Sequence, residues 1–257
     1  MERFVGKVAV VTGASSGIGE AIAKELVKYK LVVVGLARSV NKLQAISEEV
    51  LKDSKTYRGQ FHGLQCDISD EKNIKDTFQK IKSTIGLIHI LVNNAGVATP
   101  NDRGFQMISG NDFDTIFNTN TKGLVLCAKE VLDVMVDNSI AGHIINIDTI
   151  ASLSDFKVDS YHLYAASKHA VRALTTAMRR EMTRRKTNIK ISTISPGVVV
   201  TEATKEIGVG LAKPKEEALS VQDIVNACIT ILNTEPSVLI TEMTVVPLYQ
   251  YDMGGSN

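Results

Sequence analysis

The stretch TGASSGIG, residues 12–19, carries glycines at positions 13, 17 and 19. The common dinucleotide-binding fingerprint spaces its glycines as G-x-G-x-x-G, and this stretch does not. It follows a short β-branched run at Lys7–Val11 and leads into Gly19–Tyr29, where apolar residues recur at helical spacing. A glycine loop between a strand and a helix either binds phosphate or forms an ordinary turn. The stretch alone does not decide between the two.

The three glycines suit a phosphate-binding loop. Gly13 comes directly after the strand, where a tight turn needs a residue that is free in φ. Gly17 and Gly19 lack a Cβ, which lets the backbone approach a pyrophosphate and lets the helix pack close to the sheet. The N–H groups of the helix N-terminus, with the hydroxyls of Ser15 and Ser16, would then face the phosphates. The stretch has no G-K-[ST] sequence, so it is not a nucleoside-triphosphate loop.

Strands and helices alternate along the rest of the chain without a break in composition. The expected strands are Lys7–Val11, Leu31–Leu36, Phe61–Cys66, Ile88–Val92, His143–Ile147, Lys190–Ile194 and a last one near Leu239–Val246. The expected helices are Gly19–Tyr29, Lys42–Lys52, Glu71–Ile81, Phe113–Met135, Tyr164–Arg185 and Val221–Leu232. This order predicts βαβ units and a parallel sheet covered on both faces. We therefore expect one α/β domain over residues 1–257, a doubly wound, Rossmann-like parallel sheet.

Composition narrows the function classes. Of 257 residues, 44% are apolar and 22% are charged, which suits a domain with a substantial core. A formal net charge of +1 gives no reason to expect nucleic acid or an anionic membrane as a partner. Cys66, Cys127 and Cys228 are too few and too scattered for a disulfide framework or a metal site, so no metal is expected. No apolar run reaches signal-peptide or transmembrane length, which predicts a cytoplasmic protein.

Three further motifs follow later strands. NNAG at 93–96, YAASK at 164–168 and SPGVVVT at 195–201 come after the fourth, fifth and sixth strands. Ligands bind open α/β sheets at the carboxyl ends of their strands, where these motifs are expected to meet. In order and placement, TGxxxGxG, NNAG and YxxxK resemble the single-domain form of the short-chain dehydrogenase/reductase family, over nearly the whole chain. Within it, MERFVGK and the stretch after Thr201 look most like the insect farnesol dehydrogenase group and a related vertebrate cytosolic keto-steroid reductase.

Tyr164 and Lys168 would support the interconversion of a carbonyl and an alcohol. Their i, i+4 spacing places both side chains on one helix face. A free tyrosine titrates near ~10, and an ammonium close by would lower that pKa. Tyr164 could then protonate the developing alkoxide in reduction, or take the alcohol proton in the reverse direction. The resemblance implies that Lys168 also holds the nicotinamide ribose, and hydride transfer belongs to the cofactor.

The loop after the fifth strand departs from the family pattern. The family places a serine there to hydrogen-bond the substrate oxygen, whereas INIDTIASLS has Asp148 and Thr149 in place of the usual Ser-Ser pair. We expect Thr149 to take the serine role, Ser152 and Ser154 further along the loop being the alternatives, and Asp148 to cap the turn. The resemblance implies that Asn120 bends its helix and holds a water behind Lys168. A local side-chain to backbone bond is the alternative for Asn120, and both can hold.

Cofactor choice depends on the end of the second strand. NAD enzymes usually place an acid there to bond the ribose 2′-OH, and VVVGLARS has none. Arg38 can pair with a 2′-phosphate, assisted by Ser39, so NADP is the expected cofactor; a solvated surface arginine is the alternative. The other expected contacts come from the motifs and from the loop after the third strand: Gly13, Ser15, Ser16, Gly17, Ile18, Gly19, Asp67, Ile68, Asn93, Ala95, Gly96, Tyr164, Lys168, Pro196, Gly197, Val198 and Thr201.

The substrate is less well defined by the sequence. Residues 202–220 are expected to cover the pocket, and its lining would be mainly apolar. The expected lining residues are Leu153, Phe156, Val158, Leu163, Ile207, Val209 and Leu211. This lining favours an apolar alcohol or ketone, such as a terpenoid, retinoid or steroid, over a sugar. Farnesol dehydrogenase-like activity leads; a keto-steroid or general carbonyl reductase, or a catalytically weakened NADP-binding protein of the same fold, is the alternative.

Assembly is predicted from the two long helices. Phe113–Met135 and Tyr164–Arg185 carry apolar residues on more than one face. Small residues at Ala165, Ala166, Ala170 and Ala173 permit close approach of another helix. Enzymes that the chain resembles pair such helices about two-fold axes. We therefore expect a homodimer or homotetramer.

Overall fold

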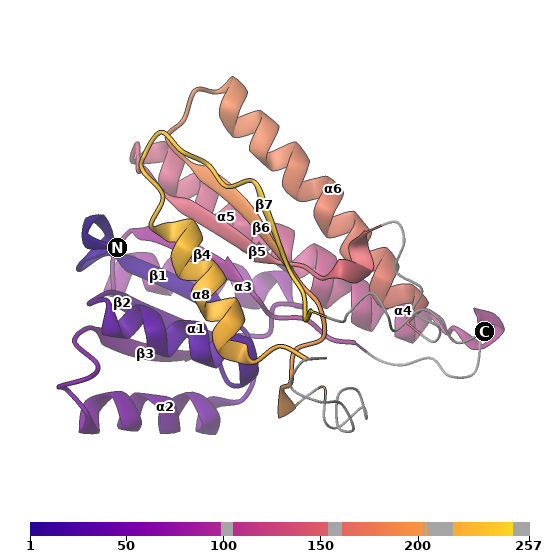
Figure 1. Cartoon of the computed structure of the whole chain (residues 1–257), viewed down its shortest axis with the longest axis horizontal. Coiled ribbons are helices and arrows are strands. Elements are labelled where there is room, and N and C mark those ends of the chain that lie inside the picture. The colour runs from indigo at the N-terminus through magenta and orange to yellow at the C-terminus, as the bar shows by residue number, and fades with distance from the viewer. Residues whose placement is uncertain (99–104, 154–160, 203, 205–217, 249–257) are drawn as a thin grey trace.

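A parallel sheet of seven strands forms the centre of the computed structural model (Figure 1). The structure describes residues 1–98, 105–153, 161–202, 204 and 218–248. The strand order is β3-β2-β1-β4-β5-β6-β7, and each neighbouring pair runs parallel. The order reverses between β1 and β4, which is where doubly wound sheets open a crevice for ligands. The predicted α/β fold is confirmed.

The bounds of the elements follow the predicted alternation. The strands are β1 Val8–Thr12, β2 Val32–Ala37, β3 Gln60–Gln65, β4 Ile88–Asn93, β5 His143–Ile147, β6 Lys190–Pro196 and β7 Glu242–Val245. The α-helices are α1 Gly17–Lys28, α2 Val40–Lys52, α3 Glu71–Thr84, α4 Gly110–Phe117, α5 Leu124–Asp137, α6 His162–Arg184 and α8 Val221–Leu232. Short 3₁₀ turns are η1 Glu2–Phe4, η2 Phe105–Met107 and η4 Ile150–Ser152, and η3 Asn118–Gly123 is a π-helix. The last strand is shorter than predicted.

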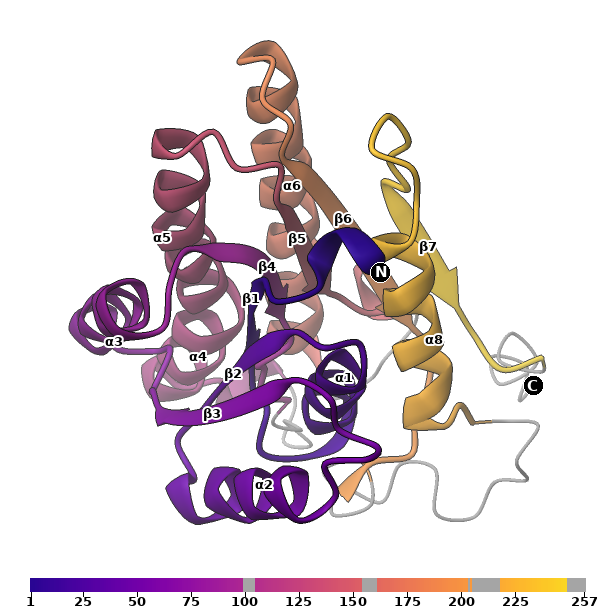
Figure 2. The same ribbon diagram turned by 90° about the vertical axis from the view of Figure 1, so that its left-hand side faces the viewer.

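The sheet is buried on both faces, which explains its runs of β-branched residues. Every position of β1 and of β5 is buried. Successive side chains point to opposite faces. Val11 and Val33 pack in one cluster with residues of α1, α2 and α8, and Val10 and Val34 pack in the other with α3, α5 and α6. Figure 2 shows these two helical layers on either side of the strands.

The long helix predicted over Phe113–Met135 is wrong in one respect, because a π-helix interrupts it. The side chain of Asn120, inside η3, is 1% exposed and bonds across the fold. Its Oδ1 accepts from the Val97 N–H at 2.8 Å, and its Nδ2 donates to the Val97 carbonyl at 2.9 Å and to Ser167 Oγ at 3.0 Å. A side chain that bonds backbone competes with regular helix geometry. The π-helix interrupts the helix at Asn120, whereas helical spacing gave no sign of the wider turn.

The described parts of the chain contain neither a membrane-spanning helix nor a cluster of metal-binding side chains. No helix there combines the length and apolar character needed to cross a membrane. No group of three or more His, Cys, Asp or Glu side chains among those residues could hold a metal ion. Cys66, Cys127 and Cys228 are buried free thiols.

Candidate active site

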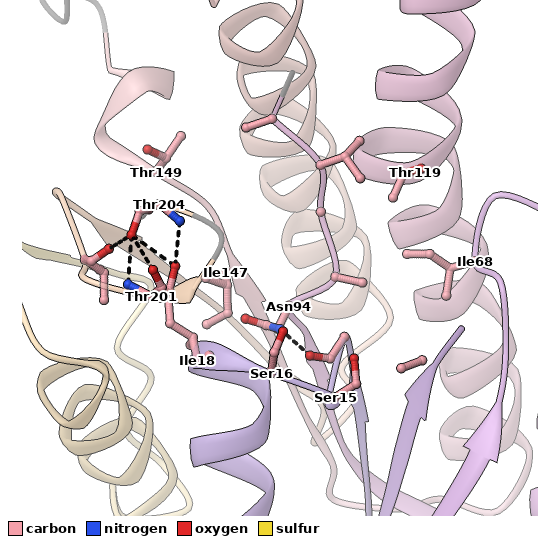
Figure 3. Close-up of a pocket in the computed structure, with 18 of the residues that line it drawn as sticks. Ser15, Ser16, Ile18, Ile68, Asn94, Thr119, Ile147, Thr149, Thr201 and Thr204 are labelled. Atoms are coloured by element: carbon pink, nitrogen blue, oxygen red, sulfur yellow. Dashed lines mark hydrogen bonds between the residues drawn. The ribbon is translucent and has the colours of Figure 1, made fainter. Parts of the chain in front are cut away.

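A cavity of about 470 Å³ opens at the carboxyl ends of the central strands. Small-molecule and cofactor sites commonly measure roughly 300–1,000 Å³. The cavity brings together most of the predicted site residues: Gly13, Ser15, Ser16, Gly17, Ile18, Arg38, Ser39, Asp67, Ile68, Ala95, Gly96, Thr149, Tyr164, Lys168, Pro196, Gly197, Val198 and Thr201. Figure 3 shows side chains from loops far apart in the sequence gathered around it.

The glycine loop is held against the end of β4. Gly13 has φ +66°, and a Cβ there would come within 2.8 Å of Ala95 Cα. Gly17 has φ +57°. The Asn94 amide nitrogen donates to the carbonyls of Thr12 at 3.1 Å and of Gly13 at 3.3 Å. The loop therefore needs glycine both for its backbone conformation and for this close approach.

Helix α1 begins at the cavity with its first N–H groups uncapped by a side chain. Ser16 occupies the N-cap position in extended conformation, and its side chain makes no capping bond. Ser15, Ser16, Gly17 and Ile18 all line the cavity. Unpaired N–H groups and the positive end of the helix dipole favour an anion at this place. The loop thus fits the pyrophosphate of a dinucleotide.

Three predicted site residues do not line the cavity: Gly19, Asn93 and Asn120. A Cβ at Gly19 would lie 2.3 Å from the Gly13 carbonyl oxygen, so this glycine lets α1 pack on its own loop. Asn93 is 2% exposed, and its Nδ2 donates to Asn146 Oδ1 on β5 at 3.0 Å. Alternation along β4 turns this side chain into a helix-covered face of the sheet. The side chain of Asn93 thus does not line the cavity, and the cofactor contact expected of this residue stays a prediction.

Asn120 is hydrogen-bonded to α6 next to Lys168 and does not line the cavity. Its amide nitrogen bonds Ser167, the residue before Lys168. Its other contacts go to the backbone of Val97, next to the NNAG motif. These bonds join η3, α6 and the loop after β4. The water relay implied for Asn120 remains a prediction.

The reactive pair projects from α6 into the cavity. Tyr164 and Lys168 both line it, one helical turn apart. Lys168 is 4% exposed, and its Nζ donates to the Ile147 carbonyl at the end of β5 at 2.9 Å. The same Nζ lies 5.9 Å from the centre of the Tyr164 ring. Burial lowers the pKa of Lys168, and the negative charge of Asp148 opposes that shift.

The pKa of Tyr164 is not lowered, contrary to expectation. Burial raises this pKa to about 12; the Thr149 hydroxyl, hydrogen-bonded to the phenol, acts against the rise, and the Asp148 charge adds to it. Among the described residues, the hydrogen bond of the Lys168 ammonium goes to the Ile147 carbonyl. Spacing on a helix predicts that two residues share a face, but not which atom the ammonium meets. Tyr164 is accordingly a neutral phenol at neutral pH.

The loop after β5 places Thr149 as predicted and Asp148 in a less expected setting. Thr149 lines the cavity, and its Oγ1 accepts from the Ala151 N–H at 3.3 Å. The Ser152 hydroxyl lies 2.6 Å from Asp148 Oδ2 and 2.8 Å from the Thr149 carbonyl, so it is engaged within the turn. Asp148 therefore bonds inside its turn, as expected. It is 4% exposed, however, and is a buried charge rather than a solvated one.

The opposite end of the cavity carries the residues that would select the cofactor. Arg38 and Ser39 follow β2 at the cavity wall and are exposed. The Arg38 carbonyl accepts from Gln65 Nε2 at 3.2 Å, which fixes its backbone to the end of β3. Asp67 Oδ1 accepts from the Ser69 N–H at 2.9 Å and from its hydroxyl at 2.7 Å. The guanidinium of Arg38 is thus placed to meet an anionic group.

Sequence reasoning missed several residues of the cavity wall, including Asn94, Thr119 and Thr204. The Thr204 hydroxyl donates to the Val199 carbonyl at 2.9 Å and accepts from the Thr201 N–H at 2.8 Å, as Figure 3 shows in part. The second asparagine of NNAG and the paired threonines of TEAT were available signals. No pattern marked Thr119.

Most of the expected substrate lining lies outside the described residues. Leu153 and Leu163 are described, and neither lines it. The other five fall outside the described residues: Phe156, Val158, Ile207, Val209 and Leu211. The described residues of the cavity wall include the glycine loop, Tyr164 and Lys168, which are expected to contact the cofactor. An apolar substrate lining stays a prediction.

Comparisons with known proteins match this picture. A family model described as short chain dehydrogenase matches residues 7–211. Farnesol dehydrogenase of Aedes aegypti is 38% identical, over 96% of this chain and 98% of its own length. Dehydrogenase/reductase SDR family member 11 of Gallus gallus is 35% identical, over 97% of this chain and 99% of its own length. An alcohol dehydrogenase from the archaeon Thermococcus sibiricus, solved with 5-hydroxy-NADP, has a TM-score of 0.82 at 26% identity, covering 95% and 97% of the two chains.

Proposed function

Because this chain belongs to the short-chain dehydrogenase family, we propose that it is an NADP-dependent oxidoreductase that interconverts an apolar alcohol and its aldehyde or ketone. One observation carries the proposal: a single cavity joins the glycine loop, Arg38 and the Tyr164–Lys168 pair. A phosphate cradle alone would suit a binding protein. A proton-exchanging pair within the same cavity suits an enzyme.

The lining residues fit NADP. Gly13, Gly17 and the first turn of α1 would hold the pyrophosphate, and Arg38 with Ser39 would hold the 2′-phosphate. Lys168 would bond the nicotinamide ribose. When bound, this cofactor would supply or accept the hydride. The Thermococcus sibiricus structure, which contains 5-hydroxy-NADP, supports the choice of cofactor.

The chain's own residues would handle the proton. Tyr164, with a pKa raised to about 12, holds its proton at neutral pH and can give it to an alkoxide. The Thr149 hydroxyl beside it would donate to the same substrate oxygen and fix its position. Reduction of a carbonyl is therefore the direction that this protonation state favours.

The proposed substrate class rests on a relative's name. The Aedes aegypti relative is named for farnesol, an apolar terpenoid alcohol. A panel of terpenoid alcohols, steroid ketones and simple carbonyl compounds, read by NADPH absorbance, tests the class. Turnover that disappears in Tyr164→Phe supports the proposal. If the protein binds NADPH but turns over no compound in the panel, it is a weakened, cofactor-binding member of the family.

We also propose that the protein is a homodimer or homotetramer. Phe113 on α4 and Leu174 on α6 are exposed apolar residues, and the exposed Ala166 and Ala173 on α6 leave room for a second helix. Packing these helices against a second copy would cover them. Light scattering at micromolar concentration should give a mass at least twice that of one chain; a single monomeric mass would reject the assembly.

A further inference from the structure

A buried carboxylate lies beside the reactive pair. Asp148 belongs to the cavity wall together with Thr149, Tyr164 and Lys168, yet it is only 4% exposed. Its Oδ2 accepts from Ser152 Oγ at 2.6 Å, and its buried Oδ1 has no hydrogen-bond partner within the described ranges. A buried carboxylate is unfavourable unless donors or a positive charge compensate it. A nearby positive charge would therefore favour the ionised carboxylate of Asp148 over the neutral acid.

The backbone around Asp148 touches both members of the pair. The residue before it, Ile147, accepts the Lys168 Nζ hydrogen bond at 2.9 Å. The residue after it, Thr149, hydrogen-bonds the Tyr164 phenol. The Asp148 N–H donates to the Ile194 carbonyl on β6 at 2.7 Å, which fixes this segment to the sheet. The carboxylate is thus fixed close to the ammonium by a rigid backbone.

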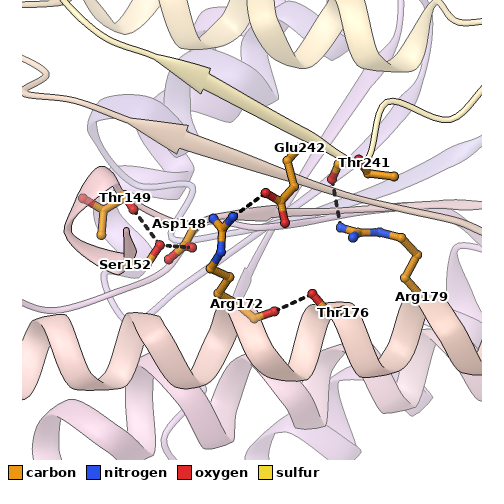
Figure 4. A network of polar contacts seen from close by, with 8 residues as sticks. All are labelled: Asp148, Thr149, Ser152, Arg172, Thr176, Arg179, Thr241 and Glu242. Atoms are coloured by element: carbon orange, nitrogen blue, oxygen red, sulfur yellow. Dashed lines mark hydrogen bonds and ion pairs between the residues drawn. The ribbon is translucent and has the colours of Figure 1, made fainter. Parts of the chain in front are cut away.

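The charges around Asp148 come from α6 and β7. Burial raises the pKa of the Asp148 carboxyl, and the positive charges of Lys168 and Arg172, one turn apart on α6, act against that rise. Arg172 has a second acidic partner, because its Nη2 bonds Glu242 on β7 at 2.6 Å (Figure 4). Within the described residues, the hydrogen-bond acceptor of Lys168 is a neutral carbonyl, and Asp148 is the carboxylate whose charge acts on it. Tyr161, one turn before Tyr164, also faces the phenol.

We propose that Asp148 is a positioning residue that serves as the counter-ion of Lys168, keeping the buried ammonium charged and seated at the end of β5. The family that the chain resembles has a neutral hydroxyl at this place, so the Asp148 carboxyl is a departure from the family pattern. The same negative charge also disfavours the phenolate of Tyr164. Both groups of the pair consequently retain their protons to higher pH than a neutral neighbour would allow.

The effect of Asp148 on turnover rests on the proposed function, whereas its proposed effect on the charge of Lys168 does not. Alcohol oxidation needs a phenolate to take the alcohol proton, so Asp148 moves its pH profile upward. Carbonyl reduction uses the neutral phenol and is little affected near neutral pH. Asp148 thereby favours reduction over oxidation in this chain.

The direct test is an NMR titration of the intact protein carrying lysine labelled with ¹³C at Cε. Lys168→Met identifies the Lys168 resonance. Asp148→Asn removes the charge with little change of shape, and the pKa of Lys168 should fall by about one pH unit. Glu242→Gln is the matched control, since it removes the same charge from the far side of Arg172. The Lys168 titration should stay nearly unchanged in this variant.

The outcomes separate the ion pair from a general effect and from the enzymatic proposal. An unchanged Lys168 titration in Asp148→Asn, or an equal shift in Glu242→Gln, overturns the counter-ion role. If Asp148→Asn does not fold, Asp148→Ser restores the family's hydroxyl and is titrated in the same way. For an identified alcohol, the midpoint of the pH profile of oxidation should also fall by about one pH unit in Asp148→Asn. A protein without turnover would sink the proposed function and leave the NMR result valid.

Discussion

The two ends of β5 each hold a buried titratable group, but the charges that surround the two groups differ. His143, at the amino end, is 1% exposed; its Nε2 lies 2.8 Å from Ser192 Oγ, and its Nδ1 has no partner within the described ranges. Burial, with the positive charges of Lys190 and Arg3, lowers the pKa of His143 to about 3. Burial also shifts the pKa of Asp148, just past the carboxyl end, toward the neutral form, but there the cations Lys168 and Arg172 act against the shift.

The difference shows where the fold can use a charge. A group buried away from any opposite charge remains neutral, and its effect is confined to stability. A group buried beside an opposite charge is held closer to its ionised form than burial alone would leave it, and it changes the protonation of its neighbours. His143, at the amino end of β5, has no opposite charge acting on it, whereas Asp148, after the carboxyl end, has two. The predictions below test this division, beginning with the largest effect.

The most severe loss should come from Tyr164→Phe, at the carboxyl end. This change removes the proposed proton donor, and general acid catalysis contributes roughly 10²–10⁴-fold to a rate. Turnover of an identified carbonyl substrate should fall by that factor, measured from NADPH absorbance. Tyr57→Phe is the control, because Tyr57 bonds Glu49 at the surface, and it should retain turnover. Similar rates in the two variants would contradict the role of Tyr164.

Thr149→Val should have the next largest effect. It preserves shape while removing a hydroxyl aimed at the substrate oxygen, and such a donor contributes about 2.7–4 kcal/mol, a hundredfold or more in rate. NADPH affinity, measured by fluorescence titration, should remain nearly unchanged. Thr149→Ser retains the hydroxyl and should retain activity. Wild-type turnover in Thr149→Val would mean that another group holds the oxygen.

Substitution of His143 should change the pH dependence of the free energy of unfolding and leave turnover unchanged. Its folded-state pKa is about 3 against an ordinary value near 6.5. As pH falls below about 6.5, the unfolded chain takes up a proton that the folded protein refuses, so stability is lost as pH falls. Between pH 7 and about 4.5 this amounts to roughly 2–3 kcal/mol of unfolding free energy.

Urea unfolding at both pH values measures that loss. His143→Gln should flatten the pH dependence by that amount, whereas His169→Gln, an exposed change on α6, should not. Turnover per folded molecule should be the same in His143→Gln and wild type. The same pH dependence in both proteins would remove the contrast between the two ends of β5.

Arg38→Ala should have the smallest effect and should separate cofactor affinity from chemistry. Hydrogen bonds to charged groups contribute about 1.5–3 kcal/mol, so the variant should lose tenfold or more in NADPH affinity and little in NADH affinity. At saturating NADPH the turnover number should be close to wild type. Equal NADPH and NADH affinities in the wild type would exclude the proposed role of Arg38.

The fold and the site were predictable from the sequence to different depths. The buried runs of β1 and β4 and their following helices predict the parallel sheet, because burial on both faces leaves a mark in composition. The motifs predict which loops gather at its edge. Neither source predicts the side to which Asn93 turns, the π-helix at Asn120, or the acceptor of the Lys168 ammonium. Those depend on partners that only the folded chain brings together.

The hydrogen bonds from Asn94 to the glycine loop bear on when the cavity forms during folding. The loop between β1 and α1 takes its shape from a residue more than eighty positions later in the chain, across the switch point of the sheet. An isolated first βαβ segment would therefore possess the motif without the pocket. Under the proposed function, cofactor affinity would belong to the assembled sheet, so a bound dinucleotide would stabilise the whole domain cooperatively rather than its amino-terminal half.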